Sequence, residues 1–233
     1  MTEPSVPSSL RMGEALTWAA RAQRGDLLAF MILSAIPVVL TAAQGIGTTP
    51  VQNVLVDCLA PQTEGQRNAC AAALSPTALL PVLISVVLVL AAFIAQVGVV
   101  RGAIVRTRGQ SPTFAEMLET QNLRSFIVYV LLFRLMFFLG IALCVLPGLV
   151  VLVFFQFGPY LILDRGMGVR QAFRASAAMA GGNLPVVVLL ALIVAVLELL
   201  GGLLFGLPML VTLPFSALIT AYVYRRLSGQ AVA

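Results

Sequence analysis

Residues 184–205 read LPVVVLLALIVAVLELLGGLLF, and the only charged residue in this apolar run is Glu198. A helix needs roughly 20 predominantly apolar residues to cross ~30 Å of hydrocarbon, and this run is long enough. The stretch therefore predicts a membrane-spanning helix with a carboxylate in its interior. Ionisable groups inside a membrane are costly and commonly functional, so Glu198 is the first candidate for a functional site.

The rest of the chain has the composition of a protein that crosses a membrane several times. Its 233 residues are 60% hydrophobic and only 10% charged. Because backbone groups inside a bilayer must bond to one another, long apolar runs predict helices. We expect an all-α fold, a polytopic membrane helix bundle of about six transmembrane helices. The other predicted spans are residues 27–43, 77–100, 125–146, 149–163 and 207–224.

These spans and their connections use nearly the whole chain, which predicts a single membrane domain over residues 11–233. Residues 1–10 are rich in Pro and Ser and predict a disordered cytoplasmic tail. A cleaved signal peptide is the less favoured alternative for the N-terminal region. The segment before its apolar core is long, carries Glu3 and Glu14 and is rich in Pro and Ser. Leu146-Pro147-Gly148 predicts a tight turn between the third and fourth spans, since Pro cannot continue a helix.

Arginine positions predict the orientation, because short cytoplasmic loops are enriched in positive charge. With the N-terminus inside, only Arg67 falls in an outer loop and only Arg134 falls within a span. The predicted topology is N-in/C-in. We assign the net charge of +5 to this topological bias and to contacts with anionic lipid headgroups. The arginines predicted to lie inside are Arg11, Arg21, Arg24, Arg101, Arg106, Arg108, Arg124, Arg165, Arg170, Arg174, Arg225 and Arg226.

Short amphipathic segments precede pairs of spans and predict cytoplasmic interfacial helices. Thr113 and Glu116 have the spacing of a capping box at the start of one such helix, with Ser111-Pro112 as an alternative start. In residues 169–177 the apolar side chains follow a 3-4 spacing while Arg170 and Arg174 share another face. This pattern is typical of a helix lying on the inner leaflet. A solvated connecting helix has nearly the same pattern, and both interpretations stay open.

The outer loop, residues 44–75, contains Cys58 and Cys70. In an oxidising compartment these two residues are candidates for a disulfide. Closing that loop would stabilise the protein by roughly 3 kcal/mol in the chain-entropy description. Two reduced thiols are the alternative, because connectivity cannot be deduced from sequence.

The polar residues inside the predicted spans form one candidate site. Counting ~1.5 Å per residue from the cytoplasmic side places Arg134 at a depth of ~14 Å and Glu198 at ~21 Å, with Gln156 near the level of Glu198. An ion pair between Arg134 and Glu198 is therefore geometrically allowed. Such a pair could be a staple, by which we mean a structural ion pair that holds two spans together. Alternatively, the three residues could bind a substrate headgroup or conduct protons. The staple is preferred, because buried pairs often serve packing specificity.

An enzymatic function is disfavoured, because the chain contains neither His nor Lys. The usual general bases, metal ligands and Schiff-base amines are thus absent. Glu198 is the only carboxylate within a predicted span, so no pair of acids can share a depth. We predict no catalytic residues, no metal and no cofactor. The scattered arginines form no nucleic-acid-binding module, so the expected partners are membrane lipids and a membrane-protein partner, with no nucleic acid.

Several short motifs carry a family resemblance: Leu146-Pro147-Gly148-Leu149, Phe157-Gly158-Pro159-Tyr160, Asp164-Arg165 and Gly182-Asn183. The pattern resembles uncharacterised actinobacterial integral membrane proteins, and more distantly the membrane domain attached to some glycerophosphodiester phosphodiesterases. The resemblance is clearest from about Thr113 onwards. It implies a six-helix bundle in the bacterial inner (plasma) membrane with no established activity. No phosphodiesterase domain is present in the sequence, so that activity is not carried over.

Two classes of function remain. The first is a multi-pass membrane protein that handles or transports a lipid or another amphiphile through the region of Arg134 and Glu198. The second is a non-enzymatic membrane scaffold or assembly partner. The first class predicts that the helices enclose a cavity around Glu198. The second predicts that they pack around an ion pair without a hydrated space.

Overall fold

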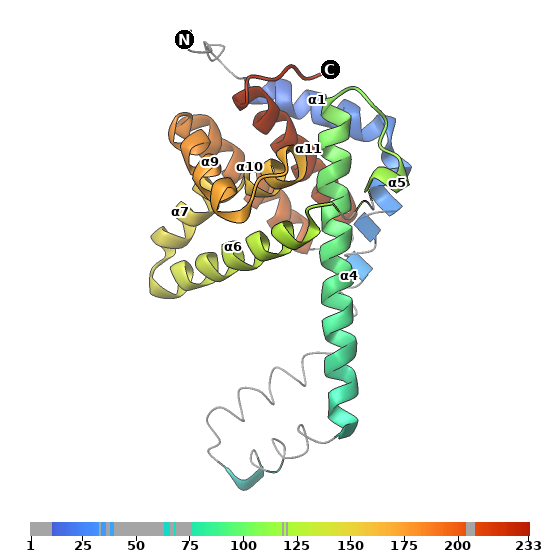
Figure 1. The fold of residues 1–233 in the computed structure, drawn as a ribbon, viewed down its shortest axis with the longest axis vertical. Helices are drawn as coiled ribbons and strands as arrows, with labels where there is room; N and C mark the ends of the chain where they lie inside the picture. Colours follow the sequence, from blue (N-terminus) through green and yellow to red (C-terminus); the bar gives the residue numbers. More distant parts are fainter. Residues whose placement is uncertain are drawn as a thin grey trace.

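The computed structural model describes residues 11–32, 34–35, 38–39, 63–65, 68, 76–117, 119, 121–203 and 208–233. Every regular element in these ranges is a helix (Figure 1), which confirms the predicted all-α class. The predicted tail, most of the outer loop and both Cys58 and Cys70 lie outside the described residues. The helices with described bounds are α1 (Met12–Gly25), α4 (Pro76–Thr107), α5 (Phe114–Met117), α6 (Leu123–Leu143), α7 (Val145–Phe155), α8 (Gly158–Arg165), α9 (Val169–Gly181), α10 (Leu184–Leu203) and α11 (Met209–Leu227). Residues 27–32, 34–35 and 38–39 are also helical.

Three segments of the described chain are long and apolar enough to cross a membrane. They are α6, the combined α7 and α8 over Val145–Arg165, and the Leu184–Gly202 part of α10. Their outer faces are apolar: on α6, Leu135 and Phe138 are 55% and 65% exposed, and on α10 Leu199 is 65% exposed. Apolar side chains in contact with the surroundings are expected of helices that face lipid.

The packed core lies around the C-terminal half of α11. Leu218, Ile219 and Tyr224 of this helix are fully buried. α4, α10 and α1 pack against α11. In Figure 1, α4 runs along the long axis of the molecule, and α6 lies across it. The core therefore gathers where the C-terminal half of α4 meets the other helices.

The corner between α6 and α7 differs in detail from the predicted turn. The helix break is at Cys144, which is extended (φ −171°, ψ 149°), while Pro147 and Gly148 lie in the first turn of α7. Proline is tolerated there because the first backbone N–H groups of a helix have no intrahelical partner. A Cβ atom on Gly140 would lie 2.7 Å from the backbone nitrogen of Gly148, so the corner closes by direct backbone contact.

The predicted fourth span is broken between α7 and α8, and Pro159 explains the break. Pro159 is in the first turn of α8 and has no backbone N–H, so the carbonyl of Phe155, four residues earlier, loses its helical donor. The hydroxyl of Tyr129 on α6 donates a 2.7 Å hydrogen bond to that carbonyl. A Cβ atom on Gly158 would lie 1.8 Å from Cζ of Tyr129, so only glycine leaves room for this ring.

Two further side chains cap the end of α7. The last four carbonyls of a helix have no intrahelical donor. The Ser176 hydroxyl on α9 donates to the carbonyl of Phe154 at 2.8 Å, and the Gln156 amide donates to that of Val153 at 3.2 Å. The backbone N–H of Phe157 donates to Ser176 Oγ at 3.3 Å. The carbonyls at the end of α7 thus receive hydrogen bonds from side chains of α6, of α9 and of the turn itself.

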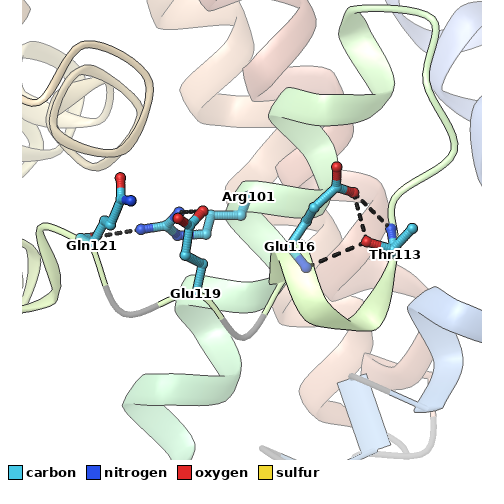
Figure 2. Close-up of polar contacts among 5 residues, drawn as sticks. All are labelled: Arg101, Thr113, Glu116, Glu119 and Gln121. Carbon is cyan, nitrogen blue, oxygen red and sulfur yellow. Dashed lines mark hydrogen bonds and ion pairs between the residues drawn. The ribbon is translucent and has the colours of Figure 1, made fainter.

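The connection from α4 through α5 to α6 is held by two polar groupings (Figure 2). The backbone N–H of Thr113 donates to Glu116 Oε2 at 3.0 Å, and the backbone N–H of Glu116 donates to Thr113 Oγ1 at 3.4 Å. These bonds confirm the predicted capping box. Arg101 forms an ion pair with Glu119 at 3.1 Å and donates to the backbone carbonyl of Gln121.

We expect Tyr129→Phe to lower the free energy of unfolding by about 1–3 kcal/mol, because the partly buried carbonyl of Phe155 would lose its donor. The measurement is chemical unfolding in detergent. The matched control is Tyr222→Phe, since the Tyr222 hydroxyl makes no hydrogen bond within the described residues. An equal loss in the two variants would contradict the capping role.

The capping box should make stability depend on pH. Hydrogen bonds from the backbone N–H and hydroxyl of Thr113 lower the pKa of Glu116 below its ordinary value of 4.5. Because this pKa is lowered in the folded state, the contribution is present above 4.5 and is lost as the pH falls through the lowered value. Melting of wild type and Glu116→Gln from about pH 3 to about pH 7 measures it. A difference that stays constant with pH would contradict this assignment.

Candidate functional site: a cavity with separated charges

A cavity of about 570 Å³ lies among α4, α6, α7, α8, α10 and α11. Its walls are mostly apolar, with a few polar side chains. Arg134, Gln156 and Glu198, which the sequence singled out, all line it. The full lining is Gln96, Val99, Val100, Phe126, Val130, Phe133, Arg134, Phe137, Leu152, Gln156, Pro159, Tyr160, Ala191, Val194, Ala195, Glu198, Leu199, Leu213, Ser216, Ala217 and Thr220.

Arg134 reaches the cavity from α6. Its Cζ atom lies 5.4 Å from the centroid of the Phe93 ring on α4, a cation–π arrangement. Such contacts contribute about 0.5–2 kcal/mol, depending on how far the cation is desolvated. Arg134 is exposed while Phe93 is buried, so the guanidinium lies where the cavity meets the surface.

Glu198 reaches the same cavity from α10. It is exposed, as is its neighbour Leu199, so the cavity also opens along this helix. The carboxylate interacts electrostatically with Arg134. Yet no ion pair within 4.0 Å joins the two residues in the described part of the chain, where the ion pairs are Arg101–Glu119, Arg106–Asp26 and Arg108–Asp164. The direct pair that the depth estimate allowed is not formed in this structure.

Gln156 is bound to backbone. Its amide nitrogen donates to the carbonyls of Val153 and Val187, each at 3.2 Å. The second bond ties the α7–α8 break to α10. Gln156 therefore positions the cavity wall, and only its side-chain oxygen is left to accept a hydrogen bond from a ligand.

The chain matches the model of one protein family, described as Domain of unknown function (DUF7847), over residues 12–232. The chain belongs to this family. It is 34% identical over 135 residues to uncharacterized protein Mb2590 of Mycobacterium bovis and to uncharacterized protein Rv2560 of Mycobacterium tuberculosis. The matched part covers 58% of this chain and 42% of each relative, so the chain spans less than half of their length. No solved structure matches the chain.

Four polar residues of this DUF7847 protein line the cavity although the sequence did not place them there. They are Gln96, Tyr160, Ser216 and Thr220. The Tyr160 hydroxyl donates to the carbonyl of Ala217 at 3.1 Å, and the Thr220 hydroxyl to that of Ser216 at 2.7 Å. Ser216 and Thr220 are one turn apart on α11, a spacing that could have indicated a shared polar face.

A second polar cluster lies outside the cavity of the DUF7847 protein. The buried side chain of Asp164 on α8 pairs with Arg108 at 2.5 Å and accepts a 2.8 Å hydrogen bond from the hydroxyl of Tyr224. Because removal of one partner would leave a buried charge, this cluster should hold α8 against α11 and the end of α4. No three His, Cys, Asp or Glu side chains in the described residues are grouped to hold a metal ion.

We expect weak energetic coupling between Arg134 and Glu198 in the ligand-free DUF7847 protein. In a double-mutant cycle with Arg134→Met and Glu198→Leu, the coupling energy should stay within about 0.5 kcal/mol, the level expected of groups that do not touch. Chemical unfolding of the four proteins measures it. Arg108→Met with Asp164→Leu is the reference cycle, because that pair is in contact. A larger coupling in the Arg134 cycle than in the reference would restore the staple hypothesis.

Proposed function

We propose that this protein is integrated in the bacterial plasma membrane and binds an amphiphile in the cavity between α6 and α10. The observation that carries the proposal is a mostly apolar cavity whose walls hold Arg134 and Glu198 apart. A dry structural staple would bring these two charges into contact, because an isolated charge inside a membrane is expensive. Their separation around a cavity fits a binding site better.

The size and position of the cavity also support an amphiphile. Small-molecule sites typically occupy about 300–1,000 Å³, are mostly apolar and contain a few fixed polar groups. The cavity of about 570 Å³ is within this range. Its mouth lies along the candidate spans α6 and α10, where exposed leucines face outwards. A lipid could therefore enter sideways from a bilayer without crossing water.

The finer topology is part of the same proposal. We propose six spans in an N-in/C-in arrangement, supported by the distribution of arginines in the sequence. Exposed arginines of the described chain include Arg165 at the end of α8 and Arg170 and Arg174 on α9, where they could contact anionic headgroups. The comparisons show no link to glycerophosphodiester phosphodiesterases, and we propose a binding role without catalysis.

Filling the cavity tests the proposal. Ala195 lines the cavity one turn before Glu198, and Ala195→Phe should occupy the space of the ligand. We expect the variant to fold and to retain about tenfold less co-purified amphiphile than wild type, as native mass spectrometry from gentle detergent would measure.

Ala178→Phe is the matched control, because Ala178 is exposed on α9 and does not line the cavity. It should retain as much amphiphile as wild type. If wild type carries no amphiphile, or if both variants retain as much as wild type, the binding proposal fails and the assembly-partner hypothesis is favoured.

A further inference from the structure

The two charges of the cavity have hydrogen-bonding capacity that the protein leaves unused. Arg134 carries five N–H donors, and an ionised Glu198 has two acceptor oxygens. Neither side chain makes a hydrogen bond or a direct ion pair within the described residues. Arg134 lies over the face of Phe93 and interacts with Glu198 only through the electrostatic field. A ligand could therefore bind both groups without displacing a protein partner.

The signs of the charges restrict the class of ligand. An anion bound to Arg134 would be repelled by Glu198, and a cation bound to Glu198 would be repelled by Arg134. A ligand with both charges avoids each repulsion. Guanidinium binds phosphate with two parallel hydrogen bonds, and a primary ammonium offers three donors to a carboxylate.

The walls of the cavity indicate that the ligand also has an apolar part. Around the two charges the lining is chiefly Val, Leu, Phe and Ala side chains. Leu199 of α10 lines the cavity and is exposed, and Leu131 and Leu135 on α6 and Leu192 on α10 are exposed on the same two helices as the charges. A headgroup in the cavity could thus have its chains running out along these leucines.

We propose that the site takes a zwitterionic amphiphile in which a short spacer joins a phosphate to a primary amine. The phosphate binds Arg134 and the ammonium binds Glu198. This inference rests on the proposed amphiphile site and names the headgroup that it selects. Phosphatidylethanolamine carries the required groups and serves as the probe.

The test compares three lipids with identical acyl chains on the delipidated full-length protein. They are phosphatidylethanolamine, phosphatidylcholine, whose quaternary amine cannot donate hydrogen bonds, and phosphatidylglycerol, which has no amine. Native mass spectrometry with added lipid gives the relative affinities. We expect wild type to prefer phosphatidylethanolamine over phosphatidylglycerol by about tenfold, with phosphatidylcholine between them. Equal affinity for the three lipids would overturn the headgroup assignment.

Two substitutions assign the charges. Glu198→Gln should reduce the amine preference to about threefold or less and leave phosphatidylglycerol binding at least as strong. Arg134→Gln should weaken all three lipids, because each contains the phosphate. Glu14→Gln on α1 makes the same chemical change outside the cavity and should keep the wild-type preference. If Glu198→Gln keeps the full preference, the ammonium site is wrong.

Further experiments address a variant that does not fold and a ligand that is not a lipid. If Glu198→Gln does not fold, Glu198→Asp keeps the charge, and the wild-type comparison of the three lipids still decides. Phosphoethanolamine, which has no acyl chains, tests for a soluble ligand. If it displaces the lipid at equal concentration, the proposal that the ligand is an amphiphile is wrong. If wild type binds all three lipids equally and Ala195→Phe abolishes this binding, the headgroup assignment is wrong but the cavity remains the site. Binding that Ala195→Phe leaves unchanged would reject the cavity as the site.

Discussion

The missing backbone N–H of Pro159 is the constraint on which the arrangement of the helices depends. It opens the chain between α7 and α8 and leaves a buried carbonyl that must find another donor. Tyr129 supplies that donor from α6, Ser176 caps the neighbouring carbonyl from α9, and Gln156 ties the break to α10. Leaving such a carbonyl unpaired would cost about 1–3 kcal/mol, so these donors hold the helices together at the break.

The cavity follows from this break. Gln156 and Pro159 both line it, so the interrupted helix forms one of its walls. Tyr160, the next residue, donates to α11 and fixes the adjoining wall. Irregular backbone at membrane depth is tolerated where protein or a cavity satisfies it, and here both conditions meet. The same residues that repair the helix thereby keep open the space next to Arg134 and Glu198.

The sequence predicted the helical class and the capping box at Thr113, because periodicity and cap spacing are local properties. By depth alone it singled out Arg134, Gln156 and Glu198, which line the cavity together with four polar residues that the sequence did not place there. It misplaced the α6–α7 corner, since proline is as compatible with the first turn of a helix as with a turn. It also allowed an ion pair that is not formed. Depth along a helix says nothing of rotation about its axis, and the contact of Arg134 with Phe93 depends on how α4 and α6 pack.

The separation of Arg134 and Glu198 is best understood as a balance between attraction and the cost of losing other contacts. Two opposite charges that line one cavity attract each other, but the attraction is weak where both groups are exposed and do not touch. Closing the pair would desolvate both groups, and this cost can offset the gain. The two backbone bonds of Gln156 meanwhile fix one wall of the cavity. A ligand that carries both charges would gain both attractions without moving either helix, and this preorganisation supports the proposed binding role over a closed ion pair.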